Sequence, residues 1–579
     1  MKLRVLALDY DGTIATDGLL HPRVRDAIES VRDQGLVVVL VTGRILADLR
    51  DLLGDLRLFD AIVAENGAVS VFPQSGRSSR LAPACSPILV ETLLARGLDV
   101  RAGDCVVELE ASLAHAALDV VHELQLPLTL HFNRGRLMIL PQAVSKITGL
   151  RETLHAMRLS VHNAIAVGDA ENDHELLTGC EVGAAVAWGS PALRAIADIV
   201  IQGKGPEDVA DYIRSVAARP RIVPPSTRRR RLLLGTDARG ETVSLAVRGR
   251  NVLIVGDPRS GKSSVAGILC EQLLLQGYCI CVLDPEGDYQ TLEALPGVML
   301  MGGNEPPPSM IELERSLRHA DVSVIVDLVR LDNPEKRRYV AQALRTLTTL
   351  RRETGLPHRI IVDEAHYFLH DVEAAHLLDH ELAGYTLITY RATDLHPDVL
   401  AATECVLVTR ETDPAEVRLL HETWRGSESD EHWQETLENL PLDEAVLLPC
   451  TEEAGGKLLP FKVAPRLTPH VRHRHKYLDV LTSKSQAFHF RFEDGRHDSL
   501  ARSLQELTDT LLKTSIPSIK GHIRRKDFSR WIKDVFGDAA LARKVRSLEE
   551  RHVADALPDF AGAVVHAVQE RYGSPLEGP

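Results

Sequence analysis

The fold is decided at residues 5–13, which read VLALDYDGT. Four consecutive apolar residues, Val5 to Leu8, are typical of a parallel strand that is buried on both faces. Asp9 and Asp11 follow at the end of this strand, the edge where open α/β sheets bind ligands. Asp9 can attack phosphorus and Asp11 can transfer the protons. Two like charges this close require a cation, and carboxylate oxygens favour Mg²⁺.

The same segment is also compatible with a simple turn closed by Asp and Gly, and three later features argue against that alternative. Residues 41–44 (VTGR) end a second apolar run and offer a hydroxyl and a glycine amide to a phosphate. Lys146 can neutralise a transferring phosphoryl group. Residues 168–173 (GDAEND) end another buried run and add carboxylates. The sequence therefore predicts a phosphoryl-transfer site built from four separate segments.

These motifs, in this order, resemble the haloacid dehalogenase superfamily, specifically its Cof-type branch (subfamily IIB), over about residues 1–215. Residues 65–68 (ENGA) are similar to that branch as well. The resemblance implies that Asp9 is the nucleophile and Asp11 the general acid and base. The implied phosphate-binding residues are Thr42, Gly43, Lys146 and Asn172. The implied Mg²⁺ site consists of Asp9, Asp11 through its backbone carbonyl, Asp169 and, in a supporting position, Asp173.

An insertion at about residues 73–143 is implied to be a small α/β cap, similar in size to that of archaeal-type phosphoglycolate phosphatases. A lid that closes over the site excludes polymers, so we expect a small phosphomonoester such as a sugar phosphate or phosphoglycolate. Trp188-Gly189 stands where relatives usually carry Asn-Ala, a departure that concerns substrate contacts and not the chemistry. The alternative is a decayed, inactive domain, but every charged motif position is intact.

A second phosphate-binding motif, GDPRSGKS, occupies residues 256–263 between an apolar strand and an apolar helical segment. That strand–loop–helix context is what a P-loop requires. The residues expected to bind ATP are Gly256, Asp257, Pro258, Arg259, Ser260, Gly261, Lys262, Ser263, Ser264 and Asp363. Ser263 and Asp363 would hold Mg²⁺, and Glu364 would act as the general base toward water. His366 is interpreted as a residue at the start of the following helix and not as a catalyst.

Residues 283–289 (LDPEGDY), the strand ending in Asp363-Glu364 and the β-rich segment 234–245 resemble the HerA/FtsK branch of P-loop ATPases, over roughly 232–460. Members of that branch work as hexameric rings, often on DNA, with an arginine finger from a neighbour. Arg391 and Arg410 are the finger candidates; the alternative is that they are surface arginines. Two departures, Asp-Pro-Arg-Ser in the loop and Thr389-Tyr390-Arg391 without a glutamine, weaken the link to DNA movement.

The length of 579 residues predicts several domains. We expect an α/β Rossmann-like phosphatase with its cap at 1–216, a linker at 217–231, a P-loop ATPase with a doubly wound sheet at 232–465, a linker at 466–485 and a mainly helical domain at 486–579. Arg228 to Arg231 are expected to be solvated in a flexible tether. His470, His473 and His475 could bind a metal, but a basic linker is the better interpretation. Phe528, Trp531 and Ile532 recur at helical spacing and are expected to be core.

The amino-acid composition and net charge argue against several classes of function. The net charge of -14 disfavours non-specific binding to nucleic acid or anionic membranes. The eight scattered cysteines form no CxxC pair, and no apolar run reaches 18 residues, so we expect a soluble cytoplasmic protein. Three hypotheses remain: a small-molecule phosphatase coupled to an ATPase ring, a nucleic-acid motor with an accessory phosphatase, and a signalling scaffold in which ATP sets the assembly state.

Overall fold

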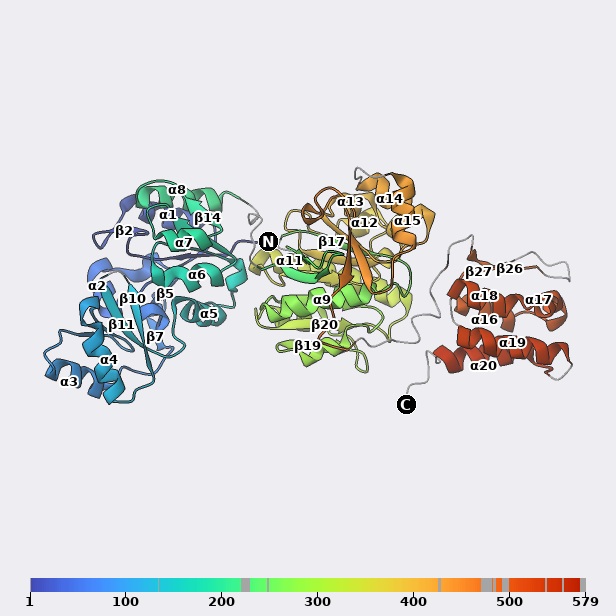
Figure 1. The fold of residues 1–579 in the computed structure, drawn as a ribbon, viewed down its shortest axis with the longest axis horizontal. Helices are drawn as coiled ribbons and strands as arrows, with labels where there is room; N and C mark the ends of the chain where they lie inside the picture. The colour runs from blue at the N-terminus through green and yellow to red at the C-terminus, as the bar shows by residue number, and fades with distance from the viewer. Residues whose placement is uncertain are drawn as a thin grey trace.

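The computed structural model of the chain is drawn in Figure 1 and describes residues 2–133, 135–219, 230–246, 249–424, 429–469, 482, 486–491, 499–536, 539–554 and 557–572. Three bodies follow one another along the chain: residues up to 219, the segment from 230 to 469, and the C-terminal part (Figure 1). Within the described ranges, no helix has the length and apolarity needed to cross a membrane. The three histidines at 470, 473 and 475 lie outside the described residues.

The first body is built on an eight-stranded sheet in the order β14-β13-β12-β1-β4-β5-β6-β7. Its parallel strands are β1 (Val5–Leu8), β4 (Val37–Val41), β5 (Ala61–Ala64), β12 (Ala164–Gly168), β13 (Val182–Val186) and β14 (Ile199–Ile201), and the antiparallel ones are β6 (Val69–Phe72) and β7 (Arg77–Arg80). The central strand β1 is buried on both faces, as its apolar run predicts.

Two helical layers cover this sheet, and β1 divides its side chains between them. Leu6 and Leu8 pack with α1 (Pro22–Asp33) and α8 (Pro206–Ala217). Val5 and Ala7 pack on the other face, among residues of α5 (Lys146–Ala156), α6 (His174–Gly179) and α7 (Pro191–Ile196). The remaining helix, α2 (Leu46–Leu53), and the hairpin β2 (Ala15–Thr16) and β3 (Leu19–Leu20) follow the motifs after β1 and β4. The Rossmann-like core predicted from the sequence is confirmed.

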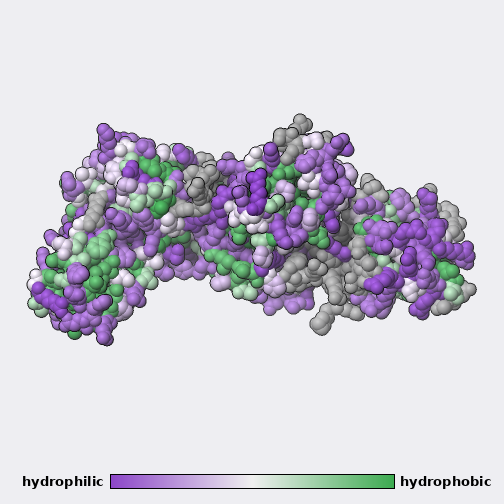
Figure 2. All heavy atoms as spheres, in the orientation of Figure 1, coloured by the Kyte–Doolittle hydropathy of each residue, from purple (hydrophilic) through white to green (hydrophobic). Residues whose placement is uncertain are grey.

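A second, antiparallel sheet forms the cap in the order β10-β11-β9-β8. Its strands are β8 (Arg101–Ala102), β9 (Val107–Glu110), β10 (Leu128–Asn133) and β11 (Arg136–Pro141), and α3 (Pro87–Ala95) and α4 (Ala114–Glu123) pack on it. The hairpin β6–β7 belongs to the core sheet, although the residues of β7 fall inside the insertion expected at 73–143. Figure 2 shows apolar residues gathered on the surface of this cap, at the lower left.

The middle body contains an eleven-stranded sheet in the order β16-β15-β25-β24-β23-β17-β22-β21-β18-β20-β19. The parallel strands are β17 (Val252–Val255), β18 (Ile280–Asp284), β19 (Val298–Gly302), β20 (Ser323–Asp327), β21 (Arg359–Val362), β22 (Tyr385–Thr389) and β23 (Cys405–Val408). The antiparallel edge consists of β15 (Leu232–Thr236), β16 (Thr242–Leu245), β24 (Glu444–Leu447) and β25 (Leu459–Val463). The helices are α9 (Lys262–Leu275), α10 (Met310–Leu317), α11 (Asn333–Thr354), α12 (Val372–Ala375), α13 (Pro397–Ala401), α14 (Pro414–Thr423) and α15 (Asp430–Glu438).

The C-terminal body is mainly helical, as predicted, with a small hairpin of β26 (Phe488–Phe490) and β27 (Ser499–Ala501). Its helices are α16 (Leu504–Leu512), α17 (Lys520–Arg525), α18 (Asp527–Phe536), α19 (Ala539–Val553) and α20 (Phe560–Tyr572). Phe528, Trp531 and Ile532 are buried in its core, which confirms the interpretation of their spacing.

Candidate active sites

The first site lies at the carboxyl edge of the eight-stranded sheet, where β1, β4 and β12 end. Asp9 follows β1, Thr42 follows β4 and Asp169 follows β12. The backbone N–H of Asp9 donates to the carbonyl of Val167 (3.0 Å), so the ends of β1 and β12 are tied together. Asp9, Thr42 and Asp169 are all buried. Segments that are far apart in the sequence therefore meet at one edge.

Lys146, the first residue of α5, lies between two carboxylates of this site. Its Nζ donates hydrogen bonds of 2.6 Å to Oδ1 of Asp9 and 2.6 Å to Oδ1 of Asp173. Burial lowers the pKa of Lys146, but Asp173 and Asp9 outweigh it, so the pKa lies above its ordinary value. Lys146 is 1% exposed. The ammonium is therefore held charged beside the proposed nucleophile.

The carboxyl group of Asp9 is buried among other carboxylates, which disfavours its charged form. Burial raises its pKa well above the ordinary value, and Asp173 and Asp169 raise it further, whereas Lys146 lowers it. The single ammonium thus compensates only part of the cost of several buried carboxylates. A divalent cation would supply the remaining positive charge and keep Asp9 ionised.

The residues present fit a magnesium ion. Carboxylate oxygens of Asp9, Asp169 and Asp173 lie within 4.8 Å of one another, and they are the hard oxygen ligands that Mg²⁺ prefers. The hydroxyl of Thr13 lies 3.2 Å from Oδ2 of Asp9 and 3.4 Å from Oδ1 of Asp169. Both carboxylate oxygens of Asp173 already accept hydrogen bonds from the protein. Oδ1 accepts from Lys146, and Oδ2 accepts from the backbone N–H groups of Asp169 (3.0 Å) and Ala170 (3.1 Å). Asp9 and Asp169 would hold the ion, while Asp173 positions Asp169 and Lys146.

Asp11 is engaged by an arginine that the sequence analysis assigned no role. Nε of Arg44 donates to Oδ2 of Asp11 (2.7 Å) and Nη2 to Oδ1 (2.6 Å), a bidentate pair. Trp188 donates from Nε1 to the carbonyl of Gly12 (2.7 Å) and so holds the turn that carries Asp11. The tryptophan that departs from the usual Asn-Ala pair therefore supports this turn. The only sequence signal for Arg44 was its place after Thr42-Gly43.

The ENGA segment ties the cap to the core. The Glu65 carboxylate accepts the backbone N–H groups of Asp104 (2.9 Å) and Cys105 (2.8 Å). Asn66 accepts a hydrogen bond of 3.2 Å from the Nδ2 of Asn172, so this segment also reaches the proposed phosphate site. Gly67 has φ of +109°, and a Cβ there would lie 2.0 Å from the Ser145 carbonyl oxygen, which only glycine avoids.

Core and cap enclose a cavity of about 540 Å³. Its core lining includes Asp9, Asp11, Thr42, Gly43, Arg44, Asp169 and Asn172. The charged residues of the cap that line it are Asp99, Arg101, Glu108, Glu110 and Arg136. Glu108 is buried and pairs with Arg136 and, at 4.0 Å, with Arg101. The proposed nucleophile therefore faces cap residues of both charges across the cavity.

The second site surrounds the loop between β17 and α9. Nζ of Lys262 donates to the carbonyls of Gly256 (2.9 Å) and Asp257 (2.8 Å), and Ser260 contacts Thr409 through their hydroxyls (2.5 Å). Gly261 has φ of +104°, the left-handed region that favours glycine at this turn. The loop therefore leads directly into the N-terminus of α9, an arrangement suited to phosphate.

Ser263, the next residue of α9, is bound by an acid that the sequence analysis did not single out. Its hydroxyl donates to Oδ2 of Asp288 (2.8 Å). Burial, then Asp288 and Asp363, raise the pKa of Asp284 well above its ordinary value, which places these three carboxyls in one neighbourhood. The signal for Asp288 was its place in the tract at 283–289. The structure thus brings the P-loop serine together with acids from the ends of β18 and β21.

The end of β21 presents Asp363 and Glu364. Glu364 adopts φ of +48°, and its backbone N–H donates to Oδ1 of Asp363 (3.0 Å). His366 follows in a short 3₁₀ turn, consistent with its interpretation as the start of a helical segment. Its Nδ1 lies 3.0 Å from the Thr389 hydroxyl, and burial lowers its pKa to about 4. A neutral His366 therefore links the end of β21 to the end of β22.

The two arginines proposed as fingers differ in setting. The backbone carbonyl of Arg410 accepts the N–H of Asp257 (2.8 Å), so Arg410 lies against the P-loop of its own chain. Arg391 reaches the Thr482 carbonyl (3.3 Å) and pairs with Asp394 (3.5 Å). Arg259 lies within the loop itself and has φ of +68°.

Two separate parts of the chain match known protein families. Residues 6–77 and 113–213 match the family described as haloacid dehalogenase-like hydrolase, and residues 242–380 match the family of the helicase HerA central domain. A phosphoglycolate phosphatase of Methanosarcina acetivorans is 27% identical over 226 residues, covering 37% of this chain and 98% of the relative. That of Natronomonas pharaonis is 30% identical over 205 residues, covering 34% and 89%. A solved haloacid dehalogenase-like hydrolase of Bacteroides thetaiotaomicron has 18% identity and a TM-score of 0.34, covering 37% of this chain and 100% of that one.

Proposed function

Because the N-terminal part of this chain belongs to the haloacid dehalogenase-like hydrolases and a HerA-type domain follows it, we propose a Mg²⁺-dependent phosphatase of small phosphomonoesters joined to an ATP-hydrolysing domain. The observation that carries the first half is the contact of Lys146 with Asp9, which lines the polar cavity between core and cap. The P-loop with Ser263 against Asp288 supports the second half.

In this proposal the Asp9 carboxylate attacks phosphorus, and the bond from phosphorus to the leaving oxygen breaks. Asp11 gives that oxygen a proton, so the products are an alcohol and an aspartyl-phosphate. Asp11 then takes a proton from the water that attacks the aspartyl-phosphate, which releases phosphate and restores Asp9. Lys146 and the Thr42 hydroxyl bind the transferring oxygens. Mg²⁺, when bound, supplies positive charge against the developing phosphoryl charge.

The cavity supports a small substrate that carries hydrogen-bonding groups. Arg101 and Arg136 of the cap suit a carboxylate such as that of phosphoglycolate, and Glu108 and Glu110 suit the hydroxyls of a sugar phosphate. The names of the phosphoglycolate phosphatases that match the chain favour the former class. The Arg136→Gln variant should separate the two, since it should raise KM for phosphoglycolate more than for a neutral sugar phosphate.

The test of the proposed function is a screen of small phosphoesters with the full chain, with and without ATP, alongside Asp9→Asn. We expect Mg²⁺-dependent phosphate release that Asp9→Asn abolishes while the fold persists, because an amide cannot form the acyl-phosphate. Asp17→Asn is a matched control, since Asp17 is an exposed acid just beyond the motif. Full activity in Asp9→Asn would overturn the proposal.

A nucleic-acid motor is the second candidate, and the match to the HerA central domain is what favours it. Its ATPase rate should then rise severalfold with DNA and fall back at high salt. The charge of -14 and the cap that lines one side of the cavity favour the small-molecule enzyme. A DNA-independent ATPase rate would leave the motor without support.

A further inference from the structure

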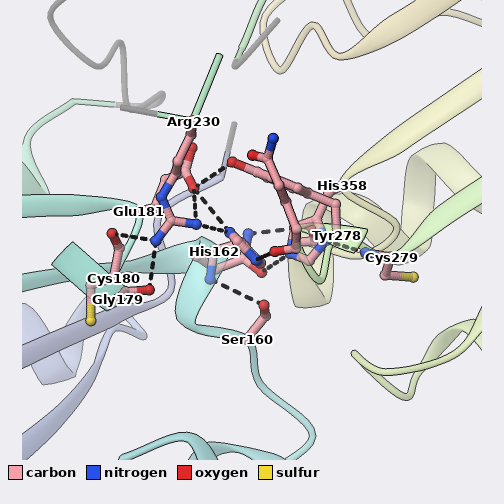
Figure 3. A network of polar contacts seen from close by, with 12 residues as sticks. Ser160, His162, Gly179, Cys180, Glu181, Arg230, Tyr278, Cys279 and His358 are labelled. Carbon is pink, nitrogen blue, oxygen red and sulfur yellow. Dashed lines mark hydrogen bonds and ion pairs between the residues drawn. The ribbon is translucent and has the colours of Figure 1, made fainter. Parts of the chain in front are cut away.

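The two enzymatic domains meet at the edges opposite their active sites. The phosphatase contributes the turn Val161–Asn163, which precedes β12, and the turn 179–181, which precedes β13. The ATPase contributes residues 276–279, which precede β18, and residues 355–358, which precede β21 (Figure 3). These are the amino-terminal ends of the strands, and the opposite ends of β12 and β21 carry the proposed site acids Asp169 and Asp363. We refer to these four segments with Arg230 as the junction.

His162 is the first of two buried imidazoles in the junction. Its Nε2 lies 3.0 Å from the Gln276 carbonyl oxygen, which only accepts, and its Nδ1 lies 2.8 Å from Nη1 of Arg230, which only donates. A neutral ring with its proton on Nε2 satisfies these two partners, and burial outweighs the Glu181 carboxylate near Nδ1, which favours a second proton. The ring stacks on Tyr278, with centroids 3.9 Å apart. Glu181, whose Oε2 lies 3.1 Å from Nδ1, accepts the Tyr278 hydroxyl (3.0 Å).

His358 is the second imidazole, and its partners impose the same state. Its Nδ1 accepts the backbone N–H of Cys279 (2.8 Å), so its proton lies on Nε2 and is donated to Oδ1 of Asn163 (3.1 Å). The amide of Asn163 donates in turn to the carbonyls of Lys2 (3.0 Å) and Gly355 (3.3 Å). Each hydrogen-bond donor in this series of contacts has an acceptor. The junction is therefore a buried hydrogen-bond network and not a loose contact.

Arg230 fastens the network from the segment that joins the domains. Its Nη2 donates to the carbonyls of Gly179 (2.6 Å), Cys180 (2.8 Å) and Thr178 (3.2 Å), at the C-terminal end of α6, where a cation is favoured. The guanidinium also lies 3.8 Å from Glu181, and its side chain is 14% exposed. The prediction of a solvated arginine at this position is therefore wrong: tertiary contacts capture it. Arg231 is also engaged, through Ser244, whereas Arg228 and Arg229 lie outside the described residues.

We infer that the junction is a docking surface that holds the phosphatase and the ATPase together at neutral pH, so that the two domains form one body whose active sites face away from each other. This arrangement replaces the flexible tether that the Pro- and Arg-rich composition predicts. It does not depend on either proposed activity. β12 and β21 hold nine residues between the junction and the two sites, a summed strand length of roughly 30 Å at ~3.3 Å per residue.

Acid should open the junction. Burial lowers the pKa of His162, and burial with the neighbouring His162 lowers that of His358 well below its usual range. The groups facing His162 are Glu181, which favours protonation, and Arg230, which opposes it. Facing His358 are His162 and Arg351, which oppose protonation, and Glu181, which favours it. The docked state thus binds fewer protons than the separated state, so docking holds above about pH 6.5 and weakens below it.

The test is to place a specific protease site within residues 220–229 of the full chain, to cleave the folded protein, and to follow the two pieces by gel filtration. At pH 7.5 we expect them to co-elute, and as the pH falls from 6.5 to 5 we expect the dissociation constant to rise at least about tenfold. Separation of the wild-type pieces at pH 7.5 would overturn the docking, and a pH-independent affinity would overturn the role of the neutral histidines.

Two variants of the cleaved protein sharpen this test. His358→Phe keeps a ring but loses the bonds to Cys279 and Asn163, and should weaken association at pH 7.5 at least about tenfold, the equivalent of one or two buried hydrogen bonds. His155→Gln is the matched control, because His155 pairs with Asp321 of the other domain beside the junction (3.8 Å) and both side chains are exposed. Equal affinities in both variants would contradict the network. The wild-type result decides the docking even where a variant fails to fold.

Discussion

The ammonium of Lys146 donates a 2.6 Å hydrogen bond to the carboxylate of Asp9. Both groups are buried, and the same ammonium serves Asp173. The pair thus holds the proposed nucleophile and, through Asp173, the backbone that carries Asp169. Lys146 is for this reason both a phosphate ligand in the proposal and the electrostatic centre of the site.

Replacing Lys146 by Met should abolish phosphatase activity and lower the stability of the first domain by about 3–5 kcal/mol without Mg²⁺, because buried carboxylates lose their cation. The double variant Lys146→Met with Asp173→Asn should recover part of the stability and none of the activity. Calorimetry of the full chain and a phosphate-release assay separate the two effects. Lys204→Met, at an exposed lysine, is the control; a comparable loss of stability there would refute the role of burial.

Magnesium should raise the melting temperature of the wild-type first domain, since the ion binds the folded site only. In Asp169→Asn the shift should largely disappear, because that carboxylate is one of the two proposed ligands. Scans at increasing Mg²⁺ concentration measure this directly. Asp198→Asn, at an acid outside the site that caps the backbone of Gly183, provides the comparison. An unchanged shift in Asp169→Asn would exclude Asp169 as a ligand.

Asp288 should prove essential for ATP hydrolysis. Asp288→Asn removes the charge that faces the Ser263 hydroxyl, and we expect a loss of roughly 10²-fold in kcat for Mg·ATP. Lys262→Ala should remove ATP hydrolysis yet leave phosphatase turnover within about twofold, because the sites face away from each other. Glu293→Gln, an exposed neighbour, should hydrolyse ATP normally. If Asp288→Asn kept its full rate, the magnesium would be held elsewhere.

Assembly is predicted to complete the ATP site. The resemblance to HerA-type ATPases predicts a hexameric ring in which an arginine of one subunit serves the next. Because Arg410 touches the P-loop of its own chain, Arg391 is the better trans candidate. Mixing Arg391→Ala with Lys262→Ala subunits should restore part of the ATPase activity, whereas Arg410→Ala with Lys262→Ala should not.

Glu364→Gln should bind ATP without hydrolysing it and favour the assembled state. Light scattering with and without ATP measures the assembly in each case. A chain that stays monomeric under all these conditions would refute the ring and leave the nucleotide domain as a switch within one chain.

The C-terminal domain should lose stability as the pH rises. Burial raises the pKa of Glu549 to about 7, although its carboxyl accepts the backbone N–H groups of Phe528 (3.2 Å) and Ser529 (3.3 Å). The folded state binds the proton more tightly than the unfolded one, so this stabilisation is complete below about pH 4.5 and is lost through about pH 7. Glu549→Gln should flatten that profile and gain about 1–3 kcal/mol at pH 8. A profile identical to the wild type would contradict this account.

Much of this architecture could be predicted, because continuous apolar runs and glycine-rich loops are local signals. Such local signals predict the strands β1, β4, β12 and β17. The motif residues that follow parallel strands of one sheet then lie close together, because the carboxyl ends of those strands share one edge. The hairpin β6–β7 could not be assigned to the core sheet, since its pairing with β5 is decided in three dimensions. The roles of Arg44, Asp288 and Arg230 were hidden for the same reason: their partners lie at least 25 residues away.

The junction joins the two domains at the edges opposite their proposed active sites, and this limits how a product of one site could reach the other. A product released at one proposed catalytic edge emerges into solvent on the far side of the body from the other edge. With the domains docked in this way we expect no direct channelling between the two proposed sites of one chain, so any metabolite they share would pass through the bulk pool. Communication between them would have to travel as a mechanical signal along the strands, not as a molecule.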